Sequence, residues 1–252
     1  MIDGKKETER FKDIDFEAFG RRALDPGMSA NEKIGFPEAF RDGLTNVIWS
    51  DFQLKLPRLA QRGAAILDIG CGCGPLPLKL MAEATRLQQH AVLNDHANML
   101  AQLPEGGVKI AGRFPDCAEA VGAATPYGFD AIICYSVLQV VAAERNPFLF
   151  VDHALELLKP GGRLLLGDIP NVSKLRRFLS SDAGIAHHKE YMKTEDAPDV
   201  PPFALHKDRL DDGFVLGLLT HIRLAGFDAW IMPQPEALPL STRREDIVIA
   251  RP

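Results

Sequence analysis

Short apolar runs alternate with segments of helical periodicity along most of the chain. The periodic segments predict helices at about 38–60, 76–84, 148–158 and 214–224. The apolar runs predict strands at 64–69, 91–93, 108–111, 129–134, 163–167, 227–232 and 246–250. Uniformly apolar strands of this length are typical of parallel strands that helices cover on both faces. We therefore expect an α/β fold with a doubly wound, seven-stranded, mostly parallel sheet.

Two segments depart from this alternation. The first 35 residues or so are polar and irregular, with a turn at Asp25–Gly27, and they lead into the helix around Trp49. Residues 170–213 are polar and rich in Pro, Asp and His. We expect 1–60 to form an N-terminal helical lid and 61–252 to form one domain, with 170–213 inserted as a cap. The alternatives are a helix that simply packs on the sheet and an insertion that is a solvated surface helix.

Composition and charge narrow the class of partner. The 252 residues are 46% apolar and 25% charged, as in an ordinary globular protein. A net charge of −5 disfavours a large nucleic-acid footprint but leaves a local basic patch open. Residues 1–13 lack the apolar stretch of a signal peptide, and the longest apolar run, 129–141, is too short to cross a bilayer. We expect a cytoplasmic protein without nucleic-acid or membrane partners; monomer and homodimer both stay open.

The four cysteines give no sign of a metal centre. Cys71 and Cys73 form a C-x-C pair, and no second pair of ligands follows at a suitable spacing. Reduced thiols and no metal site are therefore expected.

The strongest chemical signal is the turn after the first strand, Asp68-Ile-Gly-Cys-Gly-Cys-Gly-Pro75. Glycines at such a turn let the backbone pass close to a ligand, because no Cβ stands in the way. The spacing differs from the G-x-G-x-x-G of dinucleotide sites, and the Gly-Lys-Ser/Thr of a P-loop is absent. The turn indicates a ligand other than a dinucleotide or a nucleoside triphosphate.

A second signal follows the second strand, where Asp95 comes just after the apolar residues. A carboxylate at this place can accept two hydrogen bonds from ribose hydroxyls. Met99 lies four positions later, and it is either an apolar contact for a base or a core methionine.

These motifs resemble those of the class I S-adenosylmethionine-dependent methyltransferases, whose first motif is D/E-x-G-x-G-x-G. Residues 129–138 and 157–164 resemble two further motifs of that family, so the resemblance covers about 64–168. It departs at 112–116, where many relatives carry an acid directly after a glycine, and it leaves the adenine contact to Asp116 or to the backbone. The resemblance implies a Rossmann-like fold, S-adenosylmethionine as cofactor, and a cofactor site made of Asp68, Gly70, Cys71, Gly72, Gly74, Asp95, His96, Met99, Phe114, Asp116, Tyr135 and Gln139.

The acceptor is defined mainly by exclusion. The Asn/Asp-Pro-Pro-Tyr/Phe signature of adenine and amide N-methyltransferases is absent after the fourth strand, and neither a nucleophilic cysteine nor an acidic metal cluster is evident. Because ligands bind beyond the carboxyl ends of such strands, the candidate catalytic residues are Asp168, Tyr135, His187 and His188. They would orient or deprotonate the hydroxyl of a small-molecule acceptor.

Two features favour an anionic or sugar-like acceptor. Arg176 and Arg177 of the expected cap could grip an anion through bidentate contacts. The run Gly167-Asp-Ile-Pro-Asn171 is similar to segments of methyltransferases linked to bacterial surface-saccharide synthesis. O-methylation of a small acceptor is therefore the preferred interpretation. A non-catalytic S-adenosylmethionine-binding sensor or assembly protein is the alternative, and the glycine spacing disfavours a nicotinamide oxidoreductase.

Overall fold

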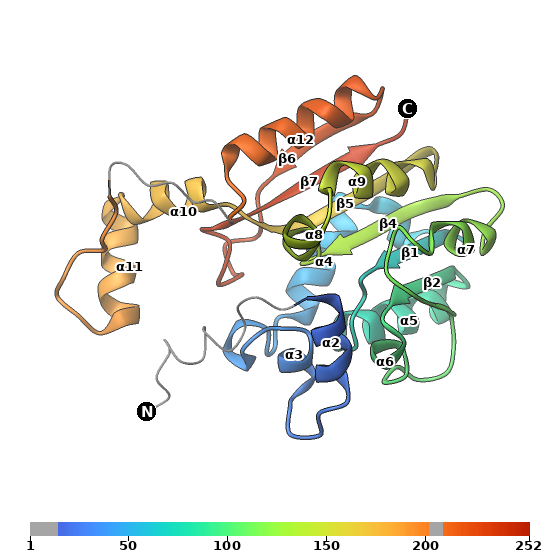
Figure 1. Cartoon of the computed structure of the whole chain (residues 1–252), viewed down its shortest axis with the longest axis horizontal. Helices are drawn as coiled ribbons and strands as arrows, with labels where there is room; N and C mark the ends of the chain where they lie inside the picture. The colour runs from blue at the N-terminus through green and yellow to red at the C-terminus, as the bar shows by residue number, and fades with distance from the viewer. Residues whose placement is uncertain (1–14, 202–208) are drawn as a thin grey trace.

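The computed structural model describes residues 15–201 and 209–252, and these form a seven-stranded sheet in the order β3-β2-β1-β4-β5-β7-β6 (Figure 1). The expectations for residues 1–14 and for the end of the cap at 202–208 lie outside the described residues. Strands β1 to β5 run parallel, while β7 is antiparallel to both β5 and β6. The predicted doubly wound, mostly parallel sheet is confirmed.

The strands follow the apolar runs closely. Their bounds are β1 Ala65–Ile69, β2 His90–Asp95, β3 Val108–Ala111, β4 Phe129–Tyr135, β5 Leu158–Pro170, β6 Asp228–Met232 and β7 Arg244–Ala250. The main difference is β5, which was expected only at 163–167. The turn-like Pro160-Gly161-Gly162 lies inside this strand, because Leu158 already pairs with Phe129 and the register then shifts before Ala131 pairs with Arg163.

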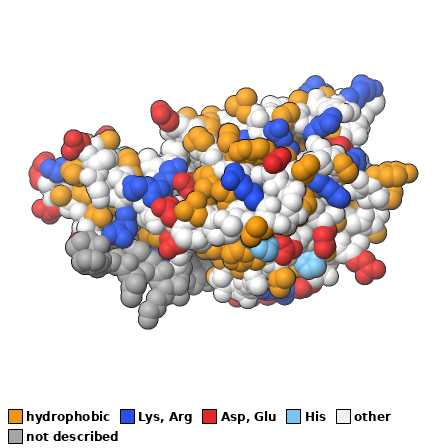
Figure 2. Space-filling model, turned by 90° about the horizontal axis from the view of Figure 1, so that it is seen from above, with side chains coloured by type: hydrophobic (Ala, Val, Ile, Leu, Met, Phe, Trp, Pro, Cys, Tyr) orange, Lys and Arg blue, Asp and Glu red, His pale blue; other side chains and the backbone are white. Residues whose placement is uncertain are grey.

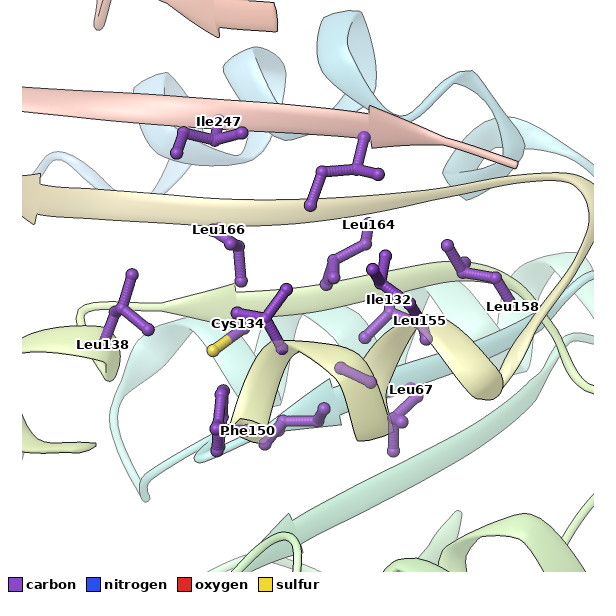
Figure 3. Packing of buried hydrophobic residues seen from close by; sticks show 14 of the residues in the cluster. Leu67, Ile132, Cys134, Leu138, Phe150, Leu155, Leu158, Leu164, Leu166 and Ile247 are labelled. Carbon is purple, nitrogen blue, oxygen red and sulfur yellow. The ribbon is translucent and has the colours of Figure 1, made fainter. Parts of the chain in front are cut away.

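Helices cover both faces of the sheet. The described residues after β1 form α5 Pro75–Leu87, α6 Ala97–Leu100, α7 Ala118–Ala123, α8 Leu138–Glu144, α9 Pro147–Glu156 and α12 Asp212–Leu224. Leu67 and Ile132 lie in one apolar core with Phe150 and Leu155 of α9 (Figure 3). Ile66 lies in a second core on the other face, with residues of α4, α5 and α6. This two-sided burial explains why the strands are apolar throughout.

The N-terminal segment is more ordered than the sequence suggested. Residues 15–35 were expected to be irregular, but they include α2 Phe16–Ala23 and α3 Ala30–Lys33. Asp15 caps α2, and Ser29 forms a capping box with Glu32 in α3, so polar side chains that look irregular in sequence begin both helices. The expected turn at Asp25–Gly27 is present, with the Gly27 amide donating to the Asp25 carboxylate.

The single helix expected at 38–60 is wrong. Three pieces replace it: η1 Glu38–Phe40, α4 Thr45–Lys55 and η2 Pro57–Ala60. Gly43 adopts a φ of 70°, which ends the helical path between η1 and α4, and Pro57 begins η2. Trp49 is buried against the sheet together with Phe52.

The first part of the expected cap forms two helices, α10 Val172–Leu179 and α11 Asp182–Met192, which we call the arm. Helix α11 packs against α10, and α10 contacts α12. Figure 1 shows the arm projecting from the end of the sheet. Seen from above, Figure 2 shows Lys and Arg side chains interspersed with acidic ones rather than a continuous basic face. No described helix is long and apolar enough to span a membrane.

Candidate functional site

One large pocket opens beside the carboxyl ends of β1, β2 and β4. It encloses about 1240 Å³ including its open mouth, and even without that mouth it has room for a small molecule, since such sites take about 300–1,000 Å³. Its walls come from the N-terminal segment, the glycine-rich turn, the loop after β3 and α8. Seven aromatic side chains line it: Phe16, Phe19, Phe36, Phe52, Phe114, Tyr135 and Phe150.

The glycine-rich turn forms one wall of the pocket. Gly70 and Gly72 have φ of 69° and 67°, a region that L side chains rarely adopt. A Cβ on Gly72 would lie 2.7 Å from Ile34 Cγ2, and one on Gly70 would lie 2.5 Å from Val137 Cγ2. Glycine is therefore required here for two reasons, the backbone conformation and the close approach of Ile34 from the N-terminal segment.

Asp95 stands at the end of β2 with its carboxylate fixed by the backbone. The Gly72 amide donates to Asp95 Oδ2 and the His96 amide donates to Oδ1, both at 2.6 Å. Burial raises the pKa of Asp95 above its ordinary value, while these two hydrogen bonds oppose that shift. Each oxygen keeps lone pairs for further donors, so Asp95 can accept hydrogen bonds from two hydroxyls of a ligand.

Asp68 is a second buried carboxyl group in the pocket wall. Burial, and then the neighbouring charge of Asp95, raises the pKa of Asp68 to about 8. No described side chain forms an ion pair with it. A cation in the pocket would favour the ionised form of this carboxyl group.

At the other end of the pocket, Arg41 joins the ends of β4 and β5. Its Nη2 lies 2.7 Å from Asp168 Oδ2 and 3.0 Å from Ser136 Oγ, and Nη1 lies 3.3 Å from the Tyr135 hydroxyl. Ser136 Oγ donates in turn to Asp168 Oδ2 at 2.6 Å. Ser136 and Asp168 are non-glycine residues with positive φ, 62° and 59°, a strained conformation that is concentrated at functional sites.

A buried charge network holds Asp168 from behind. Gln234 donates to Asp168 Oδ1 at 3.2 Å, and Asp246 accepts from the Asp168 amide at 2.8 Å. Lys55 bridges Asp246 and Asp51 at 2.7 and 2.6 Å. Burial alone would raise the pKa of Asp168, but Arg244, Arg41 and the hydrogen bonds hold it below its ordinary value. Asp168 is therefore ionised at neutral pH and its oxygens are occupied.

Tyr135 differs from Asp168 because it lines the pocket directly. Burial and the nearby Asp168 raise the pKa of its hydroxyl well above the ordinary value. The ring packs edge-on against Phe52, with centroids 4.9 Å apart. A protonated phenol at this place can donate a hydrogen bond, and it cannot act as a base near neutral pH.

The structure brings together most of the residues named from the sequence. The pocket is lined by Asp68, Gly70, Cys71, Gly72, Asp95, Met99, Phe114 and Tyr135. Met99 lines the pocket and is also buried in the core, so its position fits both a contact for a base and a core methionine. Asp168 is not in the lining, but it contacts two lining residues, Arg41 and Ser136.

Other candidates lie outside the lining. Gly74 lies against Ile34, Gln139 donates to the Ser136 carbonyl, and Asp116 forms a bidentate pair with Arg145 at the rim. His96 packs on Phe16 and faces Glu17 at 3.4 Å, where it helps to hold α2.

The candidate residues of the arm lie elsewhere. His187 packs between Phe178 and Tyr191, and neither His187 nor His188 lines the pocket. Arg177 pairs with Asp212, and Arg176 donates to the Pro201 carbonyl. The lining residues that the sequence analysis did not name include Arg41, Ser136 and Asn94, whose amide donates to the carbonyls of Ile110 and Gly112. Of these, only Ser136 had a signal, its place after the fourth strand.

Comparisons with known proteins agree with this geometry. No family model matches the chain. A ubiquinone biosynthesis O-methyltransferase of Xylella fastidiosa is 36% identical over 118 residues, which are 44% of each chain. The chain thus matches less than half the length of this curated relative.

Two solved structures match nearly the whole chain. The plantazolicin methyltransferase BpumL, in complex with SAH, aligns over 98% of this chain and 99% of its own with a TM-score of 0.57 and 15% identity. The magnesium protoporphyrin IX methyltransferase of Synechocystis PCC 6803, with bound SAM, aligns over 100% and 98% with a TM-score of 0.53 and 14% identity. The chain has the class I methyltransferase fold. Within this methyltransferase fold, the pocket lies where parallel α/β sheets bind ligands, beyond the carboxyl ends of the strands. Among the described residues, no group of three or more His, Cys, Asp or Glu is arranged to hold a metal ion.

Proposed function

We propose that the chain is an S-adenosylmethionine-dependent methyltransferase that methylates an oxygen of a small-molecule acceptor. One observation carries the proposal: a single pocket contains the glycine-rich turn and Asp95 at one end and the Arg41–Tyr135–Ser136 group at the other. The methyltransferase relatives and the methyltransferase fold support the same activity.

The residues at the first end suit S-adenosylmethionine. Asp95 has lone pairs left for the two ribose hydroxyls, and the backbone at Gly70–Gly72 can pass close to the aminoacyl portion. Met99 and Phe114 supply apolar surface for the adenine. The positive charge of the cofactor would favour the ionised form of Asp68, which would then complement that charge. When bound, the cofactor supplies an electrophilic methyl group.

The residues at the second end align the acceptor. Tyr135 stays protonated and donates a hydrogen bond to the acceptor oxygen, while Phe52 and Ile48 exclude water. Asp168 holds Ser136 and Arg41 in place and does not take a proton, because its pKa is low and its oxygens are already bonded. Transfer is then driven mainly by the alignment of the two reactants.

Calorimetry with S-adenosylmethionine and SAH, followed by transfer of a labelled methyl group to candidate acceptors, tests the proposal. Asp95→Ala should weaken cofactor binding by about 2–5 kcal/mol, because two charge-assisted hydrogen bonds are lost. Asp228→Ala is the matched control, since this exposed carboxylate of β6 lies outside the lining and should leave affinity unchanged. A wild-type protein that binds neither compound contradicts the proposal. Binding without transfer to any acceptor favours a non-catalytic sensor.

A further inference from the structure

Arg41 is a buried cation in the wall of a mostly apolar pocket. It lies between η1 and α4, is 8% exposed and lines the pocket. Its guanidinium carbon is 3.9 Å from the centroid of the Phe36 ring and 5.1 Å from that of Tyr135. Contact with two rings, together with its hydrogen bonds, restrains the orientation of the guanidinium group when a ligand enters.

The hydrogen bonds of Arg41 are incomplete. A guanidinium group has five N–H donors, and the contacts to Tyr135, Ser136 and Asp168 use three of them. Two donors therefore lack an acceptor among the described residues, and one of these is the fully buried Nε. The other free donor is an N–H of Nη1, which would gain an acceptor if an oxygen-rich ligand group lay beside Arg41.

Arg41 belongs to a network of buried charges, and it is the cation of that network that faces the pocket. The network contains three cations, Arg41, Arg244 and Lys55, and three carboxylates, Asp168, Asp246 and Asp51. It is therefore balanced overall. Its only member in the pocket lining, among the described residues, is Arg41.

The other charged residues of the lining fall into two sets. Asp68 and Asp95 belong to the proposed cofactor site, and Arg113, Glu144 and Arg145 form ion pairs. Arg113 lies 3.5 Å from Glu144, and Arg145 lies 2.6 Å from Asp116. The apolar lining at this end includes Phe36, Ile48 and Phe52. A ligand at this end therefore meets one cation, the hydroxyl-bearing side chains of Tyr135, Ser136 and Thr45, and an otherwise apolar wall.

We infer that Arg41 binds an anionic oxygen of the acceptor, and that the acceptors are apolar, ring-containing acids: carboxylates or ionised aromatic hydroxyls. This inference rests on the proposed function and names its substrate class. The acceptor oxygen gives an electron pair to the methyl carbon as the carbon–sulfur bond breaks, and the electron pair of that bond stays on sulfur. An oxygen that is already ionised needs no base, which agrees with a protonated Tyr135 and a fully bonded Asp168.

Binding and turnover with matched acceptors test this inference. The probes are aromatic carboxylates and phenols, each paired with its neutral amide or methyl ether, on protein first saturated with SAH for binding and with S-adenosylmethionine for turnover. The acids should bind at least tenfold more tightly than their neutral partners. Arg41→Gln should lower kcat/KM for the acids by about 10²–10³-fold, mostly through KM, and Arg41→Lys should keep part of the activity.

A double variant separates this role from a structural one. Arg41→Gln with Asp168→Asn removes both charges of the pair, so no carboxylate is left unpaired, and it should retain SAH affinity within about threefold while losing the preference for acids. Equal binding of the acids and their neutral partners by SAH-loaded wild type overturns the inference, as does SAH-loaded protein that binds none of the acids. Protein that fails to bind SAH contradicts the proposed function itself, which is a different result.

Discussion

The N-terminal segment, residues 15–60, and the arm, residues 172–192, look alike in sequence but differ in the structure. Both include a polar stretch that interrupts the strand–helix alternation, and the sequence suggested that each covers a site. The arm contributes no residue to the pocket lining. The N-terminal segment contributes nine: Phe16, Phe19, Asn31, Ile34, Phe36, Arg41, Thr45, Ile48 and Phe52.

The difference lies in what each segment buries. The N-terminal segment places Phe52 and Ile48 in the core and joins the sheet through Lys55, which is 4% exposed. The arm leaves Tyr191 and Met192 exposed, and its ion pair to α12, Arg177–Asp212, is on the surface. A few buried residues thus decide whether such a segment packs against the sheet and forms a pocket wall or projects from the molecule.

Breaking these ion pairs should show the largest contrast between the two segments. Lys55→Met leaves Asp246 and Asp51 buried without a cation and should lower the free energy of unfolding by about 3–5 kcal/mol. Arg177→Met breaks a solvent-exposed pair and should cost at most about 1 kcal/mol. Denaturant titration of both variants measures this, and similar losses for the two would remove the proposed distinction between the segments.

The free energy of unfolding should depend on pH through Asp68 in the pocket wall. The pKa of Asp68 is raised to about 8, so the folded state holds its proton more tightly than the unfolded state does. Its contribution is fully present below the ordinary pKa of 3.8 and is lost as the pH rises through 8. Wild type should therefore lose about 2–3 kcal/mol more than Asp68→Asn between pH 6 and pH 9.

Asp212 of α12, which pairs with Arg177 of the arm, is a control for that titration because its pKa is shifted in the opposite direction. The hydrogen bond from Arg177 lowers the pKa of Asp212, so its contribution is present above the ordinary pKa and is lost as the pH falls through the lowered one. Asp212→Asn should therefore follow wild type between pH 6 and pH 9. If Asp68→Asn and wild type also show parallel curves, the carboxyl group at 68 is not the source of the alkaline loss.

A smaller effect is expected where α2 packs against α6. A Cβ on Gly20 would lie 2.4 Å from the His96 ring, next to Asp95. Gly20→Ala should push α2 away from this end of the pocket and weaken SAH binding about tenfold, or ~1.4 kcal/mol. In α12, a Cβ on Gly217 meets nothing within 4 Å, so Gly217→Ala should bind SAH like wild type. Calorimetry that gives one affinity for both variants would show that α2 does not cover the cofactor.

The smallest effect is expected in the arm. Alanine at His187 and His188 together should change turnover by less than about twofold, because neither side chain lines the pocket. Steady-state kinetics with an identified acceptor check this, with cofactor affinity measured alongside. A loss of 10² or more in kcat would restore the hypothesis that one of them is the general base.

The parts of the fold set by local pattern were predictable. Ala65–Ile69 is apolar because both faces of β1 are buried, and the turn after it must contain glycine because Gly70 and Gly72 have positive φ. Asp95 follows from the end of β2 in the same way. Arg41 had no such signal, since its partners Ser136 and Asp168 lie 95 and 127 positions away and only the packed chain brings them together. The short helix α3 was missed because capping, rather than apolar periodicity, defines it. Phe16, Phe19 and Ala23 of α2 do lie at helical spacing, but the pattern extends over only eight residues.

The link between Lys55 and Asp246 also bears on the order in which the protein is made. The two residues are 191 positions apart, and β7, which carries Asp246, inserts between β5 and β6. A chain emerging from the ribosome can therefore pair β1 to β5 long before Asp246, the partner of Lys55 in the sheet, has been synthesised. Until then α4 can pack on the sheet through Trp49 and Phe52, but the charge of Lys55 is met by Asp51 alone. We expect nascent chains halted before residue 244 to form the parallel strands but to bind ligand more weakly than the full chain, so that synthesis of β7 completes the pocket wall.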